Sequence, residues 1–158
     1  MISKEYIAGV MDSDGSFSLV RRKYHNPRGY LYRIAIQIAW KNSDEAFNAL
    51  TEIQSLYGGN VCTYTRKSTN VSPKPNTMLK YMCESDNAVR FASEILPYLQ
   101  LKKRQAAMII ELGLIKKKWL NGRKAAPNKP NNIWDEEDKI YAEFISLNTK
   151  NGGKGRSK

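Results

Sequence analysis

The strongest constraint on the fold is a strand–strand–helix pattern that occurs twice in succession. Apolar and polar residues alternate on both sides of the turn sequence "HNPRG", as expected for a hairpin with one buried face. A helical pattern capped by Ser43 follows, and Gly58-Gly59 ends it. The same order then repeats. The predicted elements are strands over 16–24 and 30–41, a helix over 43–57, strands over 60–66 and 78–84, and a helix that begins at Ser85.

Further helical patterns flank this repeat and complete the predicted domain organisation. They are predicted over 3–13, capped by Ser3, over 102–120, which is strongly basic, and over 135–147, capped by Asp135. The pattern indicates an α+β protein with one core over residues 1–120. We expect residues 121–158 to form a linker, an appended helix and a disordered basic tail.

The overall charge restricts the class of partner. The chain has 26 Lys+Arg against 15 Asp+Glu, a net charge of +11, which favours a polyanion and nucleic acid first. No apolar run reaches the roughly 18 residues that span a bilayer, and we recognise no secretory signal at the N-terminus. Cys62 and Cys83 form no metal-binding pair with the single histidine, and we expect them to be reduced. The chain is therefore predicted to be intracellular, in an organelle or a prokaryotic cytoplasm.

The predicted hairpins carry basic residues but no acids within 16–41 and 58–83. One face of an antiparallel sheet can pack on helices while the other meets a ligand, and a two-stranded ribbon fits the major groove of DNA. Double-stranded RNA, whose major groove is narrow, fits less well. A basic face that meets only solvent is the alternative. The residues expected to face DNA are Ser18, Val20, Arg22, Arg28, Arg33, Ala35, Gln37, Tyr64, Arg66 and Lys80.

Strand alternation alone leaves one face assignment open. In 78–84, either Leu79 and Tyr81 or Lys80 and Met82 could face the groove. A shift of one residue in register would exchange the two pairs.

Two carboxylates, Asp12 and Asp14, close the first predicted helix within "DSDG". A helix C-terminus disfavours negative charge by roughly 0.3–1 kcal/mol for each carboxylate. A divalent cation would offset this cost, because Mg²⁺ is typically held by one or two carboxylates together with substrate phosphates. A simple Asx-type turn is the alternative interpretation. An EF-hand loop is excluded because Val10 and Arg21 would occupy its first and last ligand positions.

Two segments carry a resemblance to a known family. The stretch "IAGVMDSDGSF" at 7–17 resembles the LAGLIDADG motif of homing endonucleases, and "LPYLQLKKRQA" at 96–106 resembles the downstream segment of that family. The predicted element order also matches the family's αββαββα core. The resemblance implies a saddle-shaped antiparallel sheet that lies along the major groove, with additional C-terminal helices.

The resemblance also implies a mechanism. It assigns the catalytic metal-binding acid to Asp14, with the Ser13 carbonyl as a further ligand and Mg²⁺ or Mn²⁺ as the metal. It assigns the active-site lysine to Lys102, with Lys103 as the alternative. One motif in the chain implies a homodimer that cuts a long pseudo-palindromic site in double-stranded DNA. The residues expected at the dimer interface are Ile7, Ala8, Gly9, Met11 and Asp12.

The chain departs from the family pattern near the end of the second strand. The family often has a polar residue there, such as Gln, where this chain has Trp40-Lys41, and a basic residue expected a few positions later falls near Asp44. Two other functions on the same fold therefore stay open. They are an RNA-binding intron maturase and a catalytically silent DNA-binding protein.

Overall fold

The computed structural model describes residues 1–66, 76–120 and 129–151. The elements in chain order are α1 (Lys4–Ser13), β1 (Gly15–Lys23), β2 (Tyr30–Lys41), α2 (Asp44–Tyr57), β3 (Asn60–Arg66), β4 (Asn76–Glu84), α3 (Ser85–Ile95), the 3₁₀ turn η1 (Leu96–Tyr98), α4 (Lys103–Leu120) and α5 (Asn131–Asn151). The expected αββαββα order is confirmed, and so are the predicted caps. Ser3 accepts a hydrogen bond from the amide of Tyr6, and Ser43 accepts one from Ala46.

The strands form one antiparallel sheet in the order β1–β2–β4–β3. In this register Ile38 of β2 lies between Gly15 of β1 and Tyr81 of β4. Leu79 and Tyr81 are buried on the core side, so Lys80 and Met82 lie on the other face. The register thus settles the face assignment that strand alternation left open.

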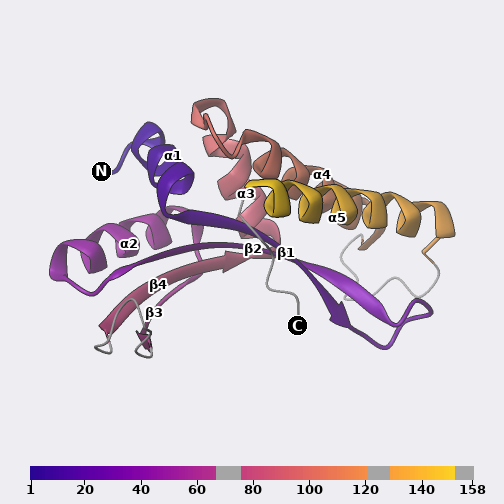
Figure 1. Ribbon diagram of the computed structural model, residues 1–158, viewed down its shortest axis with the longest axis horizontal. Coiled ribbons are helices and arrows are strands. Elements are labelled where there is room, and N and C mark those ends of the chain that lie inside the picture. Colours follow the sequence, from indigo (N-terminus) through magenta and orange to yellow (C-terminus); the bar gives the residue numbers. More distant parts are fainter. Residues whose placement is uncertain (67–75, 121–128, 152–158) are drawn as a thin grey trace.

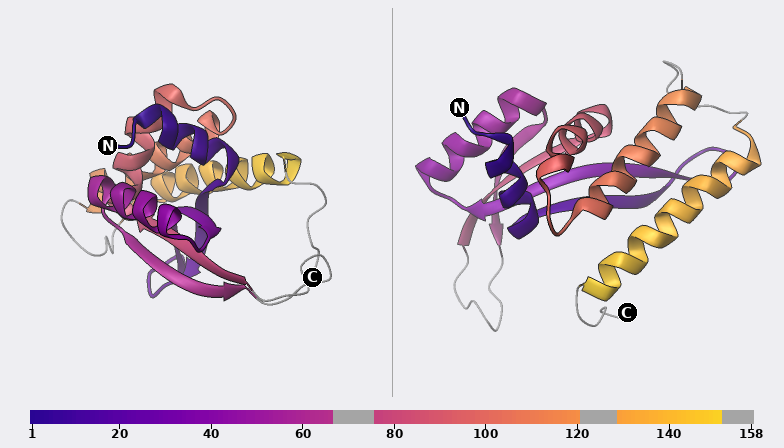
Figure 2. Two further views of the ribbon diagram at one scale, coloured as in Figure 1. Left: turned by 90° about the vertical axis from the view of Figure 1, so that its left-hand side faces the viewer. Right: turned by 90° about the horizontal axis from the view of Figure 1, so that it is seen from above.

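In the described part of the chain, every helix lies on the same side of the sheet, and the opposite face is open (Figure 1). The sheet curves away from the helices at both ends, so the open face is concave (Figure 1). Apolar residues of the sheet, α1, α2, α3 and α4 share one core with the buried Phe144 of α5. Figure 2 shows α4 and α5 running side by side above β1 and β2. The helix layer therefore shields one sheet face and leaves the other available to a ligand.

The C-terminal helix is longer than we predicted. It begins at Asn131 rather than at Asp135, because the carbonyl of Pro130 accepts hydrogen bonds from the amides of Ile133 and Trp134. Asp135 therefore lies inside the helix and does not cap it. Most of the expected linker and almost all of the basic tail lie outside the described residues.

Two further expectations concern the cysteines and the membrane. Cys62 lies exposed on β3 and Cys83 buried on β4, and the structure contains no disulfide between them. Among the described residues, no helix has both the length and the apolar character needed to cross a bilayer.

Candidate active site and nucleic-acid interface

The candidate active site lies where α1 ends and β1 begins. Asp14 closes the helix, and its amide donates to the carbonyl of Val10 at 2.8 Å. Gly15 follows as the first residue of β1. A Cβ atom at Gly15 would lie 2.6 Å from the Cα of Met11, so only glycine permits this sharp change from helix to strand. The turn leaves the Asp14 side chain exposed at the end of the helix.

Asp12 connects α1 to the segment that precedes α4. Its Oδ2 accepts a hydrogen bond from the amide of Gln100 at 2.7 Å, and its Oδ1 accepts one from the amide of Lys102 at 2.9 Å. Both carboxylate oxygens are thereby engaged with backbone. Asp12 is placed as a structural carboxylate, whereas Asp14 is the exposed one.

Lys102 places a positive charge at the C-terminal end of α1. Its Nζ donates to the carbonyls of Met11 and Gly15, each at 2.7 Å. A cation here complements the negative end of the helix dipole. Burial lowers the pKa of Lys102, although Asp12 and Asp14 oppose this shift. Lys103 is exposed, so the structure brings Lys102, rather than its neighbour, to the carboxylates.

Trp40 contacts the candidate catalytic carboxylate directly. Its Nε1 donates to Oδ2 of Asp14 at 3.2 Å. The two residues meet because β1 and β2 pair with Gly15 opposite Ile38, near the C-terminal end of β2. The departure from the family pattern that we noted at Trp40 therefore lies within the site. Asp44 instead opens α2, directly after the Ser43 cap.

The residues at this site could supply some of the ligands of a divalent metal ion. Asp14 offers a carboxylate whose other oxygen receives no hydrogen bond from the described residues, and the Ser13 carbonyl lies at the open end of the helix. No group of three or more His, Cys, Asp or Glu side chains that could hold a metal ion occurs within residues 1–66, 76–120 and 129–151. Mg²⁺ commonly takes only one or two protein carboxylates, with phosphates and water as its other ligands. The donors of one chain are thus compatible with a shared metal but do not complete its coordination.

The open face of the sheet brings together most of the predicted DNA-contacting residues. Ser18 lies opposite Ala35, Val20 opposite Arg33, and Lys80 lies between Ala39 and Cys62. The members on this face are Ser18, Val20, Arg22, Arg33, Ala35, Gln37, Tyr64, Arg66 and Lys80. Their alternation with the buried residues places them on the concave side, away from the helices (Figure 1).

Arg28 is the exception, because it lies outside the paired strands and is engaged by acids of its own chain. Its guanidinium donates to Asp135 at 2.6 Å and to Asp138 at 3.2 Å. Both acids belong to α5, which packs against the tip of the β1–β2 hairpin. Local sequence patterns do not indicate this pairing, because the contact joins residues more than one hundred positions apart.

The open face also contains a carboxylate that we did not anticipate there. Glu84 is the last residue of β4, lies opposite Ala35, and forms an ion pair with Arg33. The acid-free segment that we noted in the sequence ends at residue 83, directly before Glu84. Counting alternate residues onward from Lys80 and Met82 would have placed Glu84 on this face.

The predicted dimer interface needs a larger correction. Ile7, Ala8 and Met11 are each 0% exposed, because this side of α1 packs into the core of its own chain. They are therefore unavailable to a partner. Gly9 is exposed, and a Cβ atom added there would meet nothing within 4 Å. Asp12, the remaining predicted interface residue, is half-buried by its own chain.

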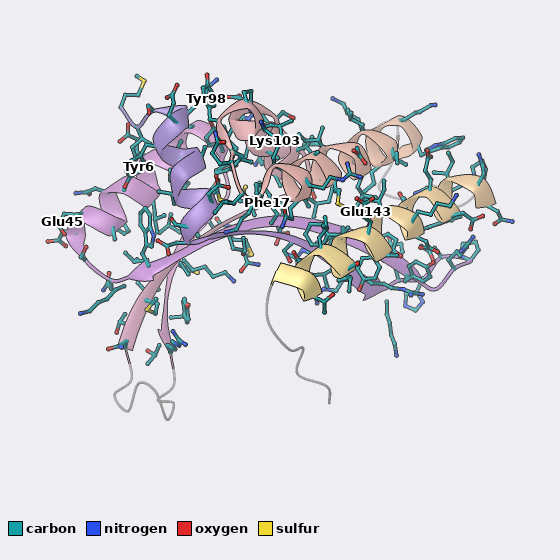
Figure 3. All side chains as sticks on the ribbon, turned by 45° about the horizontal axis from the view of Figure 1, so that its top comes forward. Tyr6, Phe17, Glu45, Tyr98, Lys103 and Glu143 are labelled. Atoms are coloured by element: carbon teal, nitrogen blue, oxygen red, sulfur yellow. The ribbon has the colours of Figure 1, made fainter. Side chains whose placement is uncertain are left out.

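The outward face of α1 is formed by other residues. Tyr6, Gly9 and Ser13 follow one another at helical spacing on the exposed side, and Tyr6 is 53% exposed. Figure 3 shows Tyr6 on α1 within the helix layer, well away from the concave face. A second molecule that approaches this side of the helix would meet these residues.

The sequence matches no protein-family model and no curated protein. In its fold, the chain is similar to the homing endonuclease I-CvuI in complex with its target, with 22% identity, a TM-score of 0.64, and coverage of 98% of this chain and 85% of that one. It is also similar to the archaeal intron-encoded homing endonuclease I-Vdi141I complexed with DNA, with 19% identity, a TM-score of 0.67, and coverage of 98% and 88%.

A third similar structure is a longer protein. The LAGLIDADG homing endonuclease I-SmaMI bound to cleaved DNA matches with 17% identity and a TM-score of 0.56. The match covers 98% of this chain but only 45% of I-SmaMI. The chain therefore has the fold of LAGLIDADG homing endonucleases, and it corresponds to most of I-CvuI but to about half of I-SmaMI.

Proposed function

We propose that this chain, which has the LAGLIDADG endonuclease fold, is a site-specific double-strand DNA endonuclease that depends on a divalent metal. The observation that carries the proposal is the exposed Asp14 carboxylate at the end of α1, with the ammonium group of Lys102 bonded to the same helix end. A carboxylate and a cation in this arrangement suit metal-assisted phosphodiester hydrolysis. The neighbouring structures bound to DNA support the same class of substrate.

The metal would be Mg²⁺ or Mn²⁺, held by Asp14 and the Ser13 carbonyl together with phosphate oxygens. Such a metal activates water for attack and stabilises the leaving oxygen. Within the chain, Trp40 orients the Asp14 carboxylate, and Lys102 supplies positive charge beside it. Asp12 holds the backbone at Lys102 in place, so it contributes to the geometry rather than to the metal.

A homodimer follows because the chain has one motif helix and therefore one acid in the position of Asp14. Cutting both strands of a duplex requires two such groups, and one chain offers one. The outward face of α1 can approach a second copy closely at Gly9, where no side chain intervenes. Two-fold symmetry would then match a pseudo-palindromic site. The chain's correspondence to about half of I-SmaMI is consistent with this stoichiometry.

The concave face would lie along the major groove of each half-site. Arg22, Arg66 and Lys80 carry positive charge on that face, and Gln37 offers a side chain that suits adenine. Phosphate contacts would supply affinity, whereas contacts to base edges would supply sequence preference.

A DNA-binding protein that does not cleave is the second candidate. Trp40 favours it, because an indole stands near the place where the family often has a polar residue, and this indole engages the acid itself. Such a protein would retain the concave face and lose only the hydrolysis.

The deciding experiment is cleavage of a randomised duplex DNA pool in Mg²⁺, followed by sequencing of the new ends. The wild-type chain is compared with Asp14→Asn and with Asp86→Asn, which removes an exposed carboxylate from the first turn of α3. We expect recurrent two-fold-symmetric cuts that vanish in Asp14→Asn and persist in Asp86→Asn. Cuts that survive in Asp14→Asn would overturn the assigned site.

The bound fraction of the same pool separates the remaining functions. Enriched sequences without cuts would replace the endonuclease with the non-cleaving DNA-binding protein. Neither cuts nor enrichment would overturn both and would favour the RNA-binding maturase.

A further inference from the structure

The open face of the sheet carries one internal ion pair, between Arg33 of β2 and Glu84 of β4. Nη2 of Arg33 donates to Oε1 of Glu84. Glu84 is the only carboxylate at the strand positions of this face within the described residues. Because the face is otherwise neutral or basic, this carboxylate is the one group there that would repel a phosphate backbone.

The stability of the folded chain gives little reason for this pair. The side chains of Arg33 and Glu84 are 41% and 29% exposed, and ion pairs with this much exposure contribute little to stability. The energetic cost near a polyanion is larger in principle, since like charges repel across the interface. The pair is better explained by what it does to the orientation of Arg33.

The surroundings leave the guanidinium accessible from the groove side. Ser18, Ala35 and Glu84 lie abreast across β1, β2 and β4, and Val20 lies opposite Arg33, so the neighbours of the pair on β1 and β2 have short, uncharged side chains. The described residues give Arg33 one hydrogen bond, and a guanidinium has five donors. Donors therefore remain for a ligand after Glu84 has fixed one edge of the group.

We propose that Arg33 reads a guanine in the major groove and that Glu84 is the positioning residue that fixes it for this contact. This inference rests on the proposed binding of double-stranded DNA by the concave face. Arginine contacts O6 and N7 of guanine through two parallel hydrogen bonds, a geometry that requires a defined orientation. The negative charge of Glu84 also disfavours a phosphate near Arg33, which directs the guanidinium to the base rather than to the backbone.

The test recovers bound duplexes from a randomised pool in Ca²⁺ and compares base frequencies between variants. The wild-type chain should select guanine at one defined position in each half-site. Arg33→Met should erase that preference and leave the other positions unchanged. Glu84→Gln should lower the preference for guanine at the same position by about tenfold, without weakening binding to random duplex.

A matched control removes the same charge from an ion pair in the helix layer. Glu143 of α5 forms an ion pair with Arg104 at 2.8 Å and is 47% exposed, and Figure 3 shows Glu143 away from the concave face. Glu143→Gln should leave every base preference unchanged. Arg33→Lys, which keeps the charge but loses the planar fork, should weaken the guanine preference less than Arg33→Met does.

Two results would overturn the inference and a third separates it from the proposed function. If Glu84→Gln changes the affinity for every sequence by the same factor, the role of Glu84 is purely electrostatic. Uniform weakening in Arg33→Met shows a phosphate contact instead of a base contact. If the wild-type chain selects no duplex sequence at all, the proposed function fails, and this inference fails with it.

Discussion

Nε1 of Trp40 lies 3.2 Å from Oδ2 of Asp14 and donates a hydrogen bond to it. The bond joins the end of β2 to the end of α1, the two elements that meet at the candidate active site. It leaves Oδ1 of the carboxylate without a hydrogen bond from the described part of the chain. The orientation of Asp14 therefore depends on a residue that the family pattern does not predict.

Replacing Trp40 with Phe keeps an aromatic ring and removes the donor. A hydrogen bond to a charged group typically contributes about 1.5–3 kcal/mol, so we expect the cleavage rate constant to fall by roughly tenfold or more. DNA affinity in Ca²⁺ should be unchanged, because Trp40 is not among the residues of the concave face. Single-turnover cleavage and fluorescence anisotropy measure the two quantities. An equal loss of affinity and rate would contradict the assignment of Trp40 to the carboxylate.

The two aspartates of "DSDG" should differ in how strongly the same substitution affects stability. Asp12→Asn loses one of two acceptors for the amides of Gln100 and Lys102, which should lower the free energy of unfolding by about 1–3 kcal/mol. Asp14→Asn removes a negative charge from a helix C-terminus and keeps an oxygen that can accept from Trp40, so it should change the free energy of unfolding by less than about 1 kcal/mol. Urea denaturation of both variants measures the difference. Equal destabilisation by the two changes would contradict the separation of roles.

Local signals in the sequence were sufficient for most of the fold. Ser3 and Ser43 cap the helices as predicted, since an N-cap depends on residues only three positions away. Strand alternation placed Ser18 and Gln37 on one face because the side-chain period of a strand is two. Asp14 was identified through its sequence motif. The glycine of that motif, Gly15, permits the turn from helix to strand that leaves Asp14 at the end of α1.

Contacts between distant elements could not be predicted from local patterns. Arg28 appeared free at a hairpin tip, and only the packing of α5 brings Asp135 and Asp138 to it. Ile7 and Met11 lie in an apolar motif helix, and the sequence does not say whether the apolar side meets its own core or a partner. In both cases the sequence identifies the chemistry of the side chain, whereas the tertiary fold decides its partner.

The lowered pKa of Lys102 leads us to expect that activity is lost at alkaline pH. Burial lowers its pKa, so the ammonium group should lose its proton below the range of an ordinary lysine. If its charge supports catalysis, the cleavage rate should fall as pH rises through this lowered pKa. Burial disfavours the charged form in the folded chain, so deprotonation removes an unfavourable contribution and should not by itself unfold the protein.

The pH–rate profile of the wild-type chain should be compared with that of Lys102→Arg. Arginine stays protonated throughout the range, so the alkaline fall should disappear even if the variant is slower overall. Circular dichroism over the same pH range checks that the fold persists. An alkaline fall that is unchanged in Lys102→Arg would assign the titration to another group.

Asp138 holds α5 against the β1–β2 hairpin through hydrogen bonds, so its replacement should show how much these bonds stabilise the contact. Its carboxylate accepts hydrogen bonds from the hydroxyls of Tyr30 at 2.7 Å and Tyr32 at 2.5 Å, and from Arg28 at 3.2 Å. Burial, together with the bond to Asp138, raises the pKa of Tyr32, so its hydroxyl stays a donor at neutral pH. In the wild-type chain Arg28, Tyr30 and Tyr32 share the two carboxylate oxygens of Asp138. Asp138→Asn leaves them one oxygen and puts an NH₂ group, which cannot accept, in place of the other.

We therefore expect Asp138→Asn to lower the free energy of unfolding by about 1–3 kcal/mol, because Tyr30 and Tyr32 are buried and water cannot readily replace the lost acceptor. Asp135→Asn is the matched control. Asp135 is more than half exposed, and Arg28 is its one ion-pair partner among the described residues, so its loss should cost about 0–1 kcal/mol. Thermal and urea unfolding of both variants measure the contrast. Equal effects would mean that the surface ion pairs, rather than the tyrosine hydroxyls, hold α5 against the hairpin.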